Sequence, residues 1–285
     1  MIQSPFLARQ ERFDVVGSTN DVVRGWLADG VPEVCLAVAD EQSAGRGREG
    51  RTWTAPAGSS LLLSLGFRPR WLEPDRMWRL PAVVSLAMAE AAEAVAGLPE
   101  GRIQLKWPND LVIDIGAATS TAWRNVETGG IVRGFDIRKV GGVLGESVGL
   151  GTDDPSVVIG IGINVNWRND TVPVHLAPTM TSLLDASGGQ SVDRDELIEA
   201  FLARIELRVV ELRDGRFDAA DWTARQMTTG HLISLHQPDG TVDVVRALGV
   251  NATSGALVIE AEGSPREVHV GEIDHVRFPT AGTRV

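Results

Sequence analysis

Residues 40–53 read DEQSAGRGREGRTW, and three glycines and three arginines fall within seven of these positions, 45–51. Glycine adopts backbone conformations with positive φ and lets the main chain approach a ligand closely. The guanidinium of arginine is a planar fork of donors that suits phosphate and carboxylate groups. Whatever fold the chain adopts must present this segment as a loop, and we expect the loop to wrap a small, anionic, largely buried ligand.

Two other interpretations of this loop remain open. The spacing Gly45-x-Gly47-x-x-Gly50 formally matches the dinucleotide-binding fingerprint, which has to open a helix whose N-terminus meets the pyrophosphate. Here Pro56 and Gly58 stand where that helix should run, so this interpretation is disfavoured. The second alternative is a basic surface loop that sits in water or touches nucleic acid, but a solvated turn does not need three closely spaced glycines.

The composition limits the class of protein. With 285 residues, the chain suits one large domain or one large and one small domain. It is 43% hydrophobic and 23% charged, so a real core is expected and wholesale disorder is not. The net charge of −11 disfavours sequence-independent nucleic-acid binding, which needs a broad basic face. A basic loop on an acidic protein indicates a localised anion site instead.

Cysteine, histidine and hydropathy patterns point to a cytoplasmic protein. The single Cys35 lies in an apolar run, and the five histidines are scattered, so neither a disulfide framework nor a zinc site is expected. Residues 1–12 lack the apolar stretch of a signal peptide. The best membrane candidate, residues 82–96, is too short and is interrupted by Glu90 and Glu93.

Lysine is rare in this chain. Of the 27 basic residues only Lys106 and Lys139 are lysine, so 25 are arginine (27 − 2). Where a chain that otherwise uses arginine keeps a lysine, this suggests that arginine is unable to do the same work at that position. The ammonium group of lysine is compact and can point three donors at one developing charge. Chance retention of the two lysines is the alternative.

Hydrophobic periodicity predicts an α/β (α+β) protein with a mixed β-sheet. Helices are expected after Ser18-Thr19-Asn20, with Ser18 or Thr19 as N-cap, from Pro81 to about Ala96, and from about Asp193. Strands are expected at 34–39, 60–67, 103–107, 111–115, 137–146 and 156–165. Glycines inside the last two strands mark a close approach by backbone or ligand. Residues 116–134 are polar, and we interpret them as an inserted surface segment.

The composition changes after Asp214-Gly215. Short β-rich runs follow at 232–235, 241–248, 256–260 and 267–270, with turn signatures at Asp239-Gly240 and Ser254-Gly255 between them. This pattern is typical of a small β-barrel appended to an α/β body. We therefore predict a large α/β domain at 1–224 and a small C-terminal β-barrel domain at 225–285.

Five segments, taken in order, resemble motifs of the biotin–protein ligases. Ser18-Thr-Asn20 is similar to the S-T-N of that family, and residues 45–53 resemble its G-R-G-R-x-G-R-x-W. Lys106-Trp-Pro-Asn-Asp110 matches K-W-P-N-D, residues 139–146 match K-x-x-G-[IV]-L-x-E, and residues 160–166 match G-x-G-I-N-x-N. The resemblance covers residues from about 14 to about 278, and a small C-terminal barrel fits it.

The resemblance implies an ATP-dependent ligase of the monofunctional type that works in two steps. Biotin and Mg·ATP form biotinyl-5′-adenylate and pyrophosphate, and biotin then passes to a lysine of the biotin carboxyl carrier domain of an acyl-CoA carboxylase. Two anions must approach in the first step while negative charge builds on phosphorus, so catalysis is mainly positioning and charge stabilisation. Neither DNA nor a membrane is an expected partner, and the chain would act as a monomer or homodimer.

It also implies roles for individual residues. Lys139 would bridge the biotin carboxylate and the α-phosphate, Lys106 would support the phosphate or the second step, and Arg48 would complete the catalytic set. The implied biotin-binding residues are Ser18, Thr19, Gln42, Gly45, Arg46, Lys139 and Gly142. The implied nucleotide-binding residues are Arg48, Arg51, Trp53, Asn109, Asp110 and Asn164, and Asp110 could hold Mg²⁺ directly or through water. Structural alternatives are a plain turn for Asn109-Asp110, a core position for Trp107, and backbone satisfaction at a strand end for Asn164.

The chain departs from the family pattern in three places. The family joins K-W-P-N-D to the second lysine by a short hairpin, which residues 113–136 lengthen here. Glu49 occupies the variable position of the loop motif, and its carboxylate slightly reduces the positive field. No helix-turn-helix precedes Phe13, so we expect no operator binding.

Two other functions are weighed against this one. A lipoate–protein ligase of the same superfamily would share the adenylating chemistry, although the arginine–glycine loop with Trp53 favours biotin. A non-catalytic module that binds an anion or nucleic acid would keep its ligand affinity in a Lys139→Ala variant and would have no activity to lose.

Overall fold

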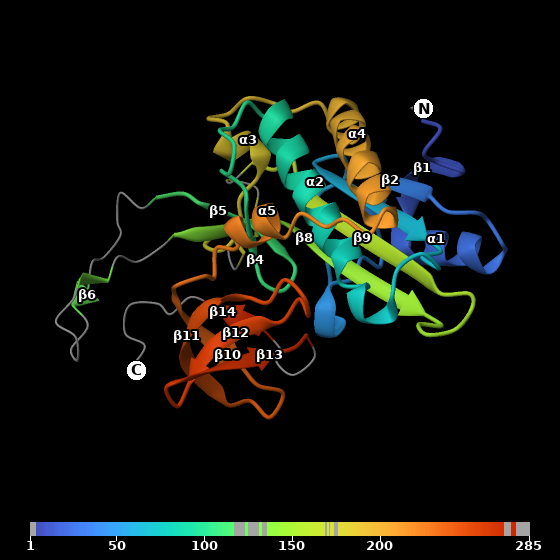
Figure 1. The fold of residues 1–285 in the computed structure, drawn as a ribbon. Helices are drawn as coiled ribbons and strands as arrows, with labels where there is room; N and C mark the ends of the chain where they lie inside the picture. Colours follow the sequence, from blue (N-terminus) through green and yellow to red (C-terminus); the bar gives the residue numbers. More distant parts are fainter. Residues whose placement is uncertain are drawn as a thin grey trace.

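The computed structural model describes residues 4–116, 123–124, 131–132, 136–168, 170, 172–173, 176–270 and 275–277. They form a mixed seven-stranded sheet packed with helices, followed along the chain by a smaller antiparallel sheet (Figure 1). The α/β class with a mixed sheet and a small C-terminal β unit is confirmed.

The large sheet has the strand order β1-β2-β3-β9-β8-β5-β4. Its strands span Arg9–Val16 (β1), Cys35–Gln42 (β2), Ser60–Phe67 (β3), Gln104–Lys106 (β4), Asp110–Asp114 (β5), Ile137–Val148 (β8) and Ser156–Asn164 (β9). β1 runs parallel to β2, and the other neighbours pair antiparallel. Every residue of β3 is buried, as expected of a central strand covered on both faces.

Alternate residues of β2 contribute to two different cores. Leu36 belongs to the main core together with the helices α2 (Arg79–Val95) and α4 (Arg194–Arg213), which lie side by side (Figure 1). Cys35 packs instead against apolar residues of α1 (Thr19–Ala28). Successive side chains of a strand point to opposite faces, so α1 covers one face of the sheet and the α2–α4 pair covers the other.

The starts of two predicted helices can be explained in detail. α2 begins at Arg79, two residues before the predicted start at Pro81. The first N–H groups of a helix have no partner within it, so a proline in the first turn costs no hydrogen bond. α4 begins after Asp193, as predicted, and the Asp193 carboxylate accepts from the N–H groups of Asp195 and Glu196 at 2.8 and 3.3 Å.

The smaller sheet has the strand order β13-β12-β11-β10-β14. Its strands span Leu232–His236 (β10), Val242–Val250 (β11), Leu257–Ala261 (β12), Ser264–Val268 (β13) and His275–Arg277 (β14). All of its neighbouring strands pair antiparallel. The fourth predicted run, 267–270, was placed too late by a few residues, and β14 was not predicted.

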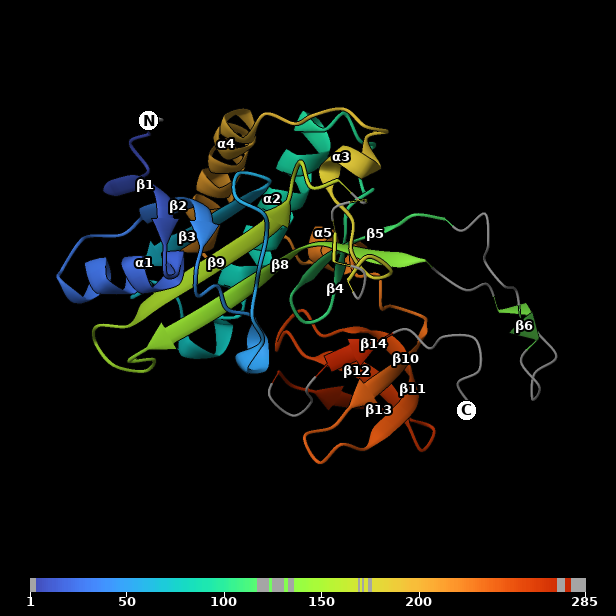
Figure 2. The same ribbon diagram turned by 180° about the vertical axis from the view of Figure 1, so that it is seen from behind.

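The small sheet lies next to the β4 edge of the large one (Figure 2), and the linker between them is tied down by main-chain hydrogen bonds. The N–H of Leu105 donates to the O of Arg225, and the N–H of Met227 donates to the O of Leu105, both at 2.8 Å. Residues 225–227, which follow α5 (Ala219–Ala224), therefore extend the large sheet beyond β4. The predicted division into 1–224 and 225–285 falls in this linker and stays a prediction.

The remaining elements are short. They are η1 (Arg48–Gly50), η2 (Pro74–Arg76), α3 (Leu183–Ala186), β6 (Trp123–Arg124) and β7 (Ile131–Val132), the last two of which pair with each other. Apart from Gly116, β6 and β7, the predicted surface segment 116–134 lies outside the described residues. Within the described ranges, none of the helices combines the length and the apolar character needed to cross a membrane.

Candidate active site

A buried polar corner lies at the start of α1, where Ser18 stands in the N-cap position. Thr19 donates from its main-chain N–H and from its hydroxyl to Oε1 of Gln42, at 2.8 and 3.0 Å. Ser64, a polar residue within the apolar strand β3, has its Oγ 2.7 Å from Oγ1 of Thr19. Ser18, Thr19 and Ser64 are all buried, so this corner offers hydroxyl and amide groups largely shielded from bulk water.

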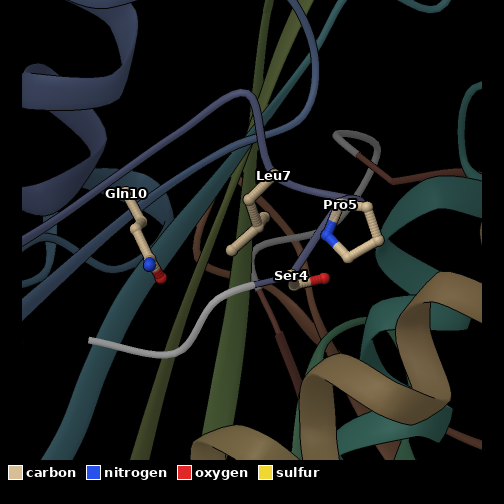
Figure 3. A pocket seen from close by; sticks show the side chains of 4 residues that line it. All are labelled: Ser4, Pro5, Leu7 and Gln10. Atoms are coloured by element: carbon tan, nitrogen blue, oxygen red, sulfur yellow. The ribbon is translucent and has the colours of Figure 1, made fainter.

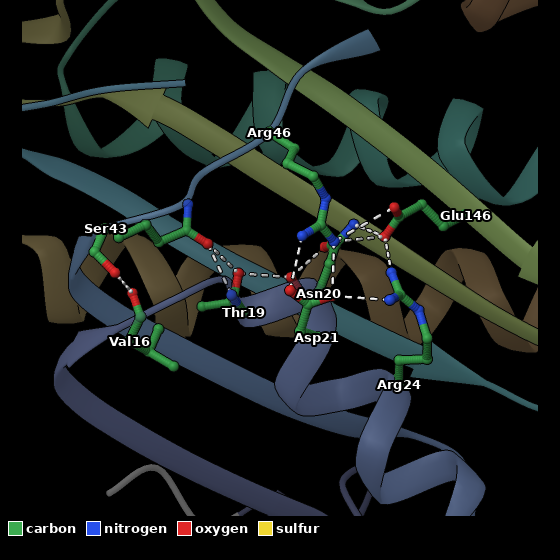
Figure 4. A network of polar contacts seen from close by, with 10 residues as sticks. Val16, Thr19, Asn20, Asp21, Arg24, Ser43, Arg46 and Glu146 are labelled. Carbon is green, nitrogen blue, oxygen red and sulfur yellow. Dashed lines mark hydrogen bonds and ion pairs between the residues drawn. The ribbon is translucent and has the colours of Figure 1, made fainter. Parts of the chain in front are cut away.

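Arg46 of the loop is held by two carboxylates on neighbouring elements (Figure 4). Its guanidinium makes a bidentate pair with Asp21 of α1, at 2.7 and 2.8 Å, and lies 3.5 Å from Glu146 of β8. Glu146 also accepts from Asn20 and Arg24, each at 2.7 Å. The hydrogen bonds from Arg46 lower the pKa of Asp21 below its usual value. Arg46 thus ties the loop to α1 and β8.

The arginine–glycine loop is a hydrogen-bonded hairpin. The N–H of Trp53 donates to the O of Gly45 at 2.9 Å, and the N–H of Gly47 donates to the O of Arg51 at 2.6 Å. A Cβ on Gly45 would lie only 2.4 Å from the main-chain O of Trp53, so this position accepts glycine alone. Gly45 therefore serves the hairpin itself, and so does Gly50, whose φ is 70°.

The tip of the hairpin carries Arg48 and Arg51. Both pair with the carboxylate of Glu49, at 3.0 and 3.2 Å. The three-residue turn η1 at this tip is followed by the strand β3 and not by an α-helix. The dinucleotide-binding interpretation requires a helix directly after the glycines, so the structure excludes it.

The indole of Trp53 lies against two glycines of β8 and β9. A Cβ on Gly162 would lie 2.6 Å from Cε2 of the ring, and one on Gly142 would lie 3.5 Å from Cζ3. Nζ of Lys139 is 5.2 Å from the ring centroid, a cation–π distance. The Trp53 Nε1–H is buried and has no hydrogen-bond partner in the described part of the chain. Such an unpaired donor is costly, and an acceptor on a ligand would satisfy it.

Both lysines of the chain meet at one carboxylate. Nζ of Lys139 lies 2.6 Å from Oδ1 of Asp110, and Nζ of Lys106 lies 2.9 Å from Oδ2. Burial by itself pushes the pKa of Asp110 up, but the two ammonium groups outweigh it and hold this pKa well below its usual value. Two ammonium groups and one carboxylate leave a net charge of +1 in a mostly buried place, which suits an anionic substrate.

Three strands position this cluster. Lys106 ends β4, Asp110 begins β5, and Lys139 lies on β8 opposite Val112. The register between β5 and β8 shifts between Leu111 and Val112. A register irregularity of this kind re-aims a side chain relative to its strand, and here it lies next to Lys139.

Asn109 and Asn164 satisfy main-chain groups. Nδ2 of Asn109 donates to the O of Val143 at 2.8 Å, and Nδ2 of Asn164 donates to the O of Thr181 at 3.0 Å. Oδ1 of Asn164 is buried and accepts from no group of the described residues. The structural alternative weighed for Asn164, backbone satisfaction at a strand end, is thus realised.

Trp107, between Lys106 and Asp110 in the sequence, points into the small C-terminal sheet. Its side chain is 3% exposed and shares a core with Ile233, Leu235, Ala247, Leu257, Ile259, Val268 and Val276. Its Nε1–H donates to the O of Gly255 at 3.0 Å. Trp107 is a core residue, as the sequence suggested, but the core belongs to the C-terminal sheet. Trp107 therefore anchors the turn that carries Lys106 and Asp110 to the small sheet.

A chain of contacts joins many of the predicted site residues. In order, these are Lys106, Asp110, Lys139, Trp53, Gly45, Gln42 and Thr19, with Gly142 against Lys139 and Trp53. Sequence reasoning gave no site role to the polar residues that surround this group, which are Asn20, Asp21, Ser64 and Glu146. Two signals were available: Ser64 interrupts an apolar run, and Glu146 closes the motif that begins at Lys139.

A separate hollow of about 500 Å³ lies near the N-terminal segment, lined by Ser4, Pro5, Leu7 and Gln10 (Figure 3). None of these four residues is charged, and none belongs to the predicted site. This hollow does not suit a small anion.

Known proteins resemble this chain in sequence and in structure. The model of the biotin/lipoate A/B protein ligase family matches residues 13–164. The chain is 30% identical over 271 residues to a biotin–[acetyl-CoA-carboxylase] ligase of Mycobacterium tuberculosis, covering 93% of this chain and 90% of the relative. It is 31% identical over 249 residues to a ligase of the same name from Paracoccus denitrificans, covering 87% and 92%. A biotin protein ligase from Aquifex aeolicus, solved in complex with biotin and ATP, superposes with a TM-score of 0.72 and 26% identity, covering 95% of this chain and 99% of that one.

Proposed function

Because this chain belongs to the biotin/lipoate A/B protein ligase family, we propose that it is an ATP-dependent biotin–protein ligase. It forms biotinyl-5′-adenylate from biotin and ATP, releases pyrophosphate, and transfers the biotinyl group to a lysine of the biotin carboxyl carrier domain of an acyl-CoA carboxylase. The proposal rests above all on the meeting of the two lysines of the chain at Asp110, beside Trp53 and Gly142.

In the first step an oxygen of the biotin carboxylate bonds to the α-phosphorus of ATP, and the bond from that phosphorus to the pyrophosphate oxygen breaks. Both reacting groups are anions, so the step needs fixed positive charge where they converge. Lys139 and Lys106 supply it, and Asp110 keeps the two ammonium groups close together until the substrates arrive. A net charge of +1 at this place attracts the substrates without leaving two uncompensated cations in a buried site.

The polar corner at α1 binds the other end of biotin. A ureido ring has one carbonyl and two N–H groups, and each needs a polar partner when it is buried. Ser18, Thr19 and Gln42 supply hydroxyl and amide groups there. Gly142 lies against Lys139 and Trp53 and lets the bicycle approach the main chain between them, whereas Gly45 acts through the hairpin, because the main-chain O of Trp53 fills the space beside it.

The hairpin 45–53 covers the reacting centre. Arg48 and Arg51 carry the guanidinium groups that bind phosphate oxygens, and Arg46 anchors the hairpin through Asp21. A covered site keeps water away from the mixed anhydride, which would otherwise be hydrolysed. In the second step the ε-amine of the carrier lysine attacks the carbonyl carbon of the adenylate, and AMP leaves.

Magnesium does not fit Asp110 as the described side chains stand. Each of its oxygens is within 3 Å of an ammonium nitrogen, at 2.6 and 2.9 Å. The described residues hold no cluster of three or more His, Cys, Asp or Glu that would bind a metal ion. We therefore assign Asp110 to the two lysines, and Mg²⁺ would enter with the phosphates of ATP.

The direct test is to incubate the full chain with Mg·ATP, biotin and a carrier domain and to measure the mass of both proteins. We expect the carrier domain to gain one biotinyl group and the ligase to gain none covalently. The proposal fails if the carrier mass stays unchanged while a known biotin ligase modifies the same carrier preparation.

The substrate assignment is tested separately by ATP–pyrophosphate exchange with biotin or with lipoate. Exchange with lipoate alone would make the chain a lipoate ligase, and exchange with neither would favour a non-catalytic anion-binding module. We expect exchange with biotin, and we expect the activity in the cytoplasm, where ATP and the carboxylase carrier domain would be available to it.

A further inference from the structure

The carboxylate of Glu49 sits between the two arginines at the hairpin tip. Oε1 of Glu49 is 3.0 Å from Nη2 of Arg48, and Oε2 is 3.2 Å from Nη2 of Arg51. Each oxygen thus faces a different guanidinium. The side chain of Arg48 is 17% exposed and that of Arg51 is 54% exposed, so the pair with Arg48 is the less screened of the two.

The hairpin fixes this arrangement. The N–H of Arg51 donates to the O of Arg48 at 3.2 Å, closing the turn around Glu49. Glu49 itself has φ 53°, a left-handed conformation that non-glycine residues seldom adopt. The carboxylate is therefore held next to both arginines by the backbone and competes with any ligand at a high effective concentration.

We propose that Glu49 is an internal counter-anion that occupies Arg48 and Arg51 until the phosphates of ATP displace it. The inference rests on the proposed function, which gives these two arginines to the nucleotide. Displacement costs part of the binding free energy of the phosphates, so Glu49 weakens nucleotide binding and speeds the release of the nucleotide-bearing intermediate. The residue at the variable position of the loop motif then sets how long the adenylate stays on the enzyme.

A merely structural role for Glu49 predicts the opposite change in ATP affinity when the carboxylate is removed. If the carboxylate only held the two guanidinium groups in place for the ligand, its removal would make their positions less ordered, and the phosphates would bind less tightly. The direction of the change in ATP affinity therefore shows whether Glu49 competes with the phosphates for the two arginines or only holds the arginines in place.

The test compares Glu49→Gln with Glu262→Gln in the full chain. Glu262 is also a non-glycine residue with positive φ, 51°, and lies between β12 and β13 in the small sheet. The two variants make the same change in net charge at the same backbone conformation. Calorimetric titration with Mg·ATP should give a Kd for E49Q roughly threefold to tenfold below that of the wild type, as expected for one or two partly exposed ion pairs. The gain should shrink as the salt concentration rises.

The Kd for biotin should be the same in all three proteins, because the polar corner at Thr19 and Gln42 does not involve Glu49. Glu49→Asn, whose short side chain tolerates the left-handed conformation, repeats the measurement if E49Q folds poorly. An ATP affinity that is unchanged or weaker in E49Q overturns the inference, as does an equal gain in E262Q or a lack of ATP binding in every variant. If the wild type makes no adenylate and E49Q still binds ATP more tightly, the proposed function fails and the role of Glu49 stands.

Discussion

Asp110 and its two lysines form a charge cluster that is incomplete without an anion. The single carboxylate compensates only one of two ammonium groups that lie within 3 Å of it, at 2.6 and 2.9 Å. The remaining positive charge is expensive in a mostly buried place and becomes favourable when phosphate or carboxylate arrives. The cluster therefore keeps one uncompensated positive charge with which it can bind an anionic ligand.

Lys139→Gln tests this cluster directly. The amide of glutamine stays polar but is one bond shorter than the lysine side chain, and it lacks the charge that faces the reacting anions. We expect biotin-dependent ATP–pyrophosphate exchange to fall by at least about 100-fold, which is the usual cost of losing one charge-stabilising donor. Arg138→Gln is the control, since Arg138 pairs with Asp136 rather than with Asp110. Equal activities for the two variants would remove Lys139 from the mechanism.

Cys35 gives a prediction about pH. It is fully buried, and burial raises the pKa of its thiol to about 11. Between pH values of about 8.5–9, the ordinary pKa of a thiol, and about 11, the thiol stays protonated in the folded state but loses its proton in the unfolded chain. Stability from this group is full below that window and declines as the pH rises through it, by up to about 3 kcal/mol for a shift of about two units. Urea unfolding from pH 8 to 10.5 should show a steeper loss for the wild type than for Cys35→Ala, and parallel curves would contradict it.

At the level of single residues, chemistry-bearing types could be read from the sequence and their partners could not. The rarity of lysine pointed to Lys106 and Lys139, and both lie in one cluster. The pairing of Arg46 with Asp21 and Glu146 joins residues up to 100 positions apart in the chain. Tertiary packing of the loop, α1 and β8 brings these residues together, and no local pattern encodes it.

Among the elements, β8 and β9 provide a surface without side chains for Trp53. Gly142 and Gly162 are neighbours in the register of these strands, and both face the indole. Glycine in a strand interior normally weakens the strand, so its presence at paired positions marks a place where another group must come close.

Gly162→Ala probes this contact. The new Cβ would lie 2.6 Å from Cε2 of Trp53, so the indole or the strand must move. We expect a loss of about 1–3 kcal/mol in the free energy of unfolding, the usual cost of overpacking. Trp53→Ala should recover most of that loss in a double-mutant cycle measured by urea unfolding. Gly145→Ala on β8, where the nearest atom is 3.4 Å away, should cost much less. A loss in Gly162→Ala that persists without the indole would show that Trp53 is not the obstacle.

The elements that were predicted and those that were missed differ in burial. β3 spans the predicted 60–67 because every one of its residues is buried and the run is apolar. β1 was missed because its sequence, RQERFDVV, is mostly polar or charged. Within the described sheet β1 is an edge strand beside β2, held there by backbone hydrogen bonds and by the partly buried Phe13, which packs against the core that contains Trp26. The charged side chains on it also suit an edge, where they discourage pairing with another chain.

For the whole molecule, the main consequence of the fold is that the small sheet and the turn of Lys106 and Asp110 are joined through one side chain, that of Trp107. Trp107 fills the second core and belongs to the same turn as Lys106 and Asp110. The sequence indicated a core position for Trp107 but not the partner, because the residues that surround it lie more than 120 positions further along the chain. Tertiary packing of this kind is invisible to any local pattern.

Trp107→Ala should therefore destabilise the small sheet and the site together. Removing a buried tryptophan costs about 3–5 kcal/mol, and we expect a lower Tm with earlier exchange of amide protons in β10–β14. Trp71→Ala, which removes a partly buried indole bonded to Glu33 on another part of the molecule, should cost less and leave β10–β14 protected. Retention of the wild-type exchange pattern in Trp107→Ala would show that the small sheet holds itself together.

The two hydrogen bonds between Leu105 and the linker also govern where this protein can be divided. A fragment ending at Ala224 would expose the outer edge of β4 directly beside Lys106, and its loose N–H and C=O groups would invite self-association. A fragment that extends to Thr229 would keep residues 225–227, which cover the edge of β4. A fusion that replaces the small sheet with a sensor or a targeting tag should therefore be joined after Thr229, not directly after α5.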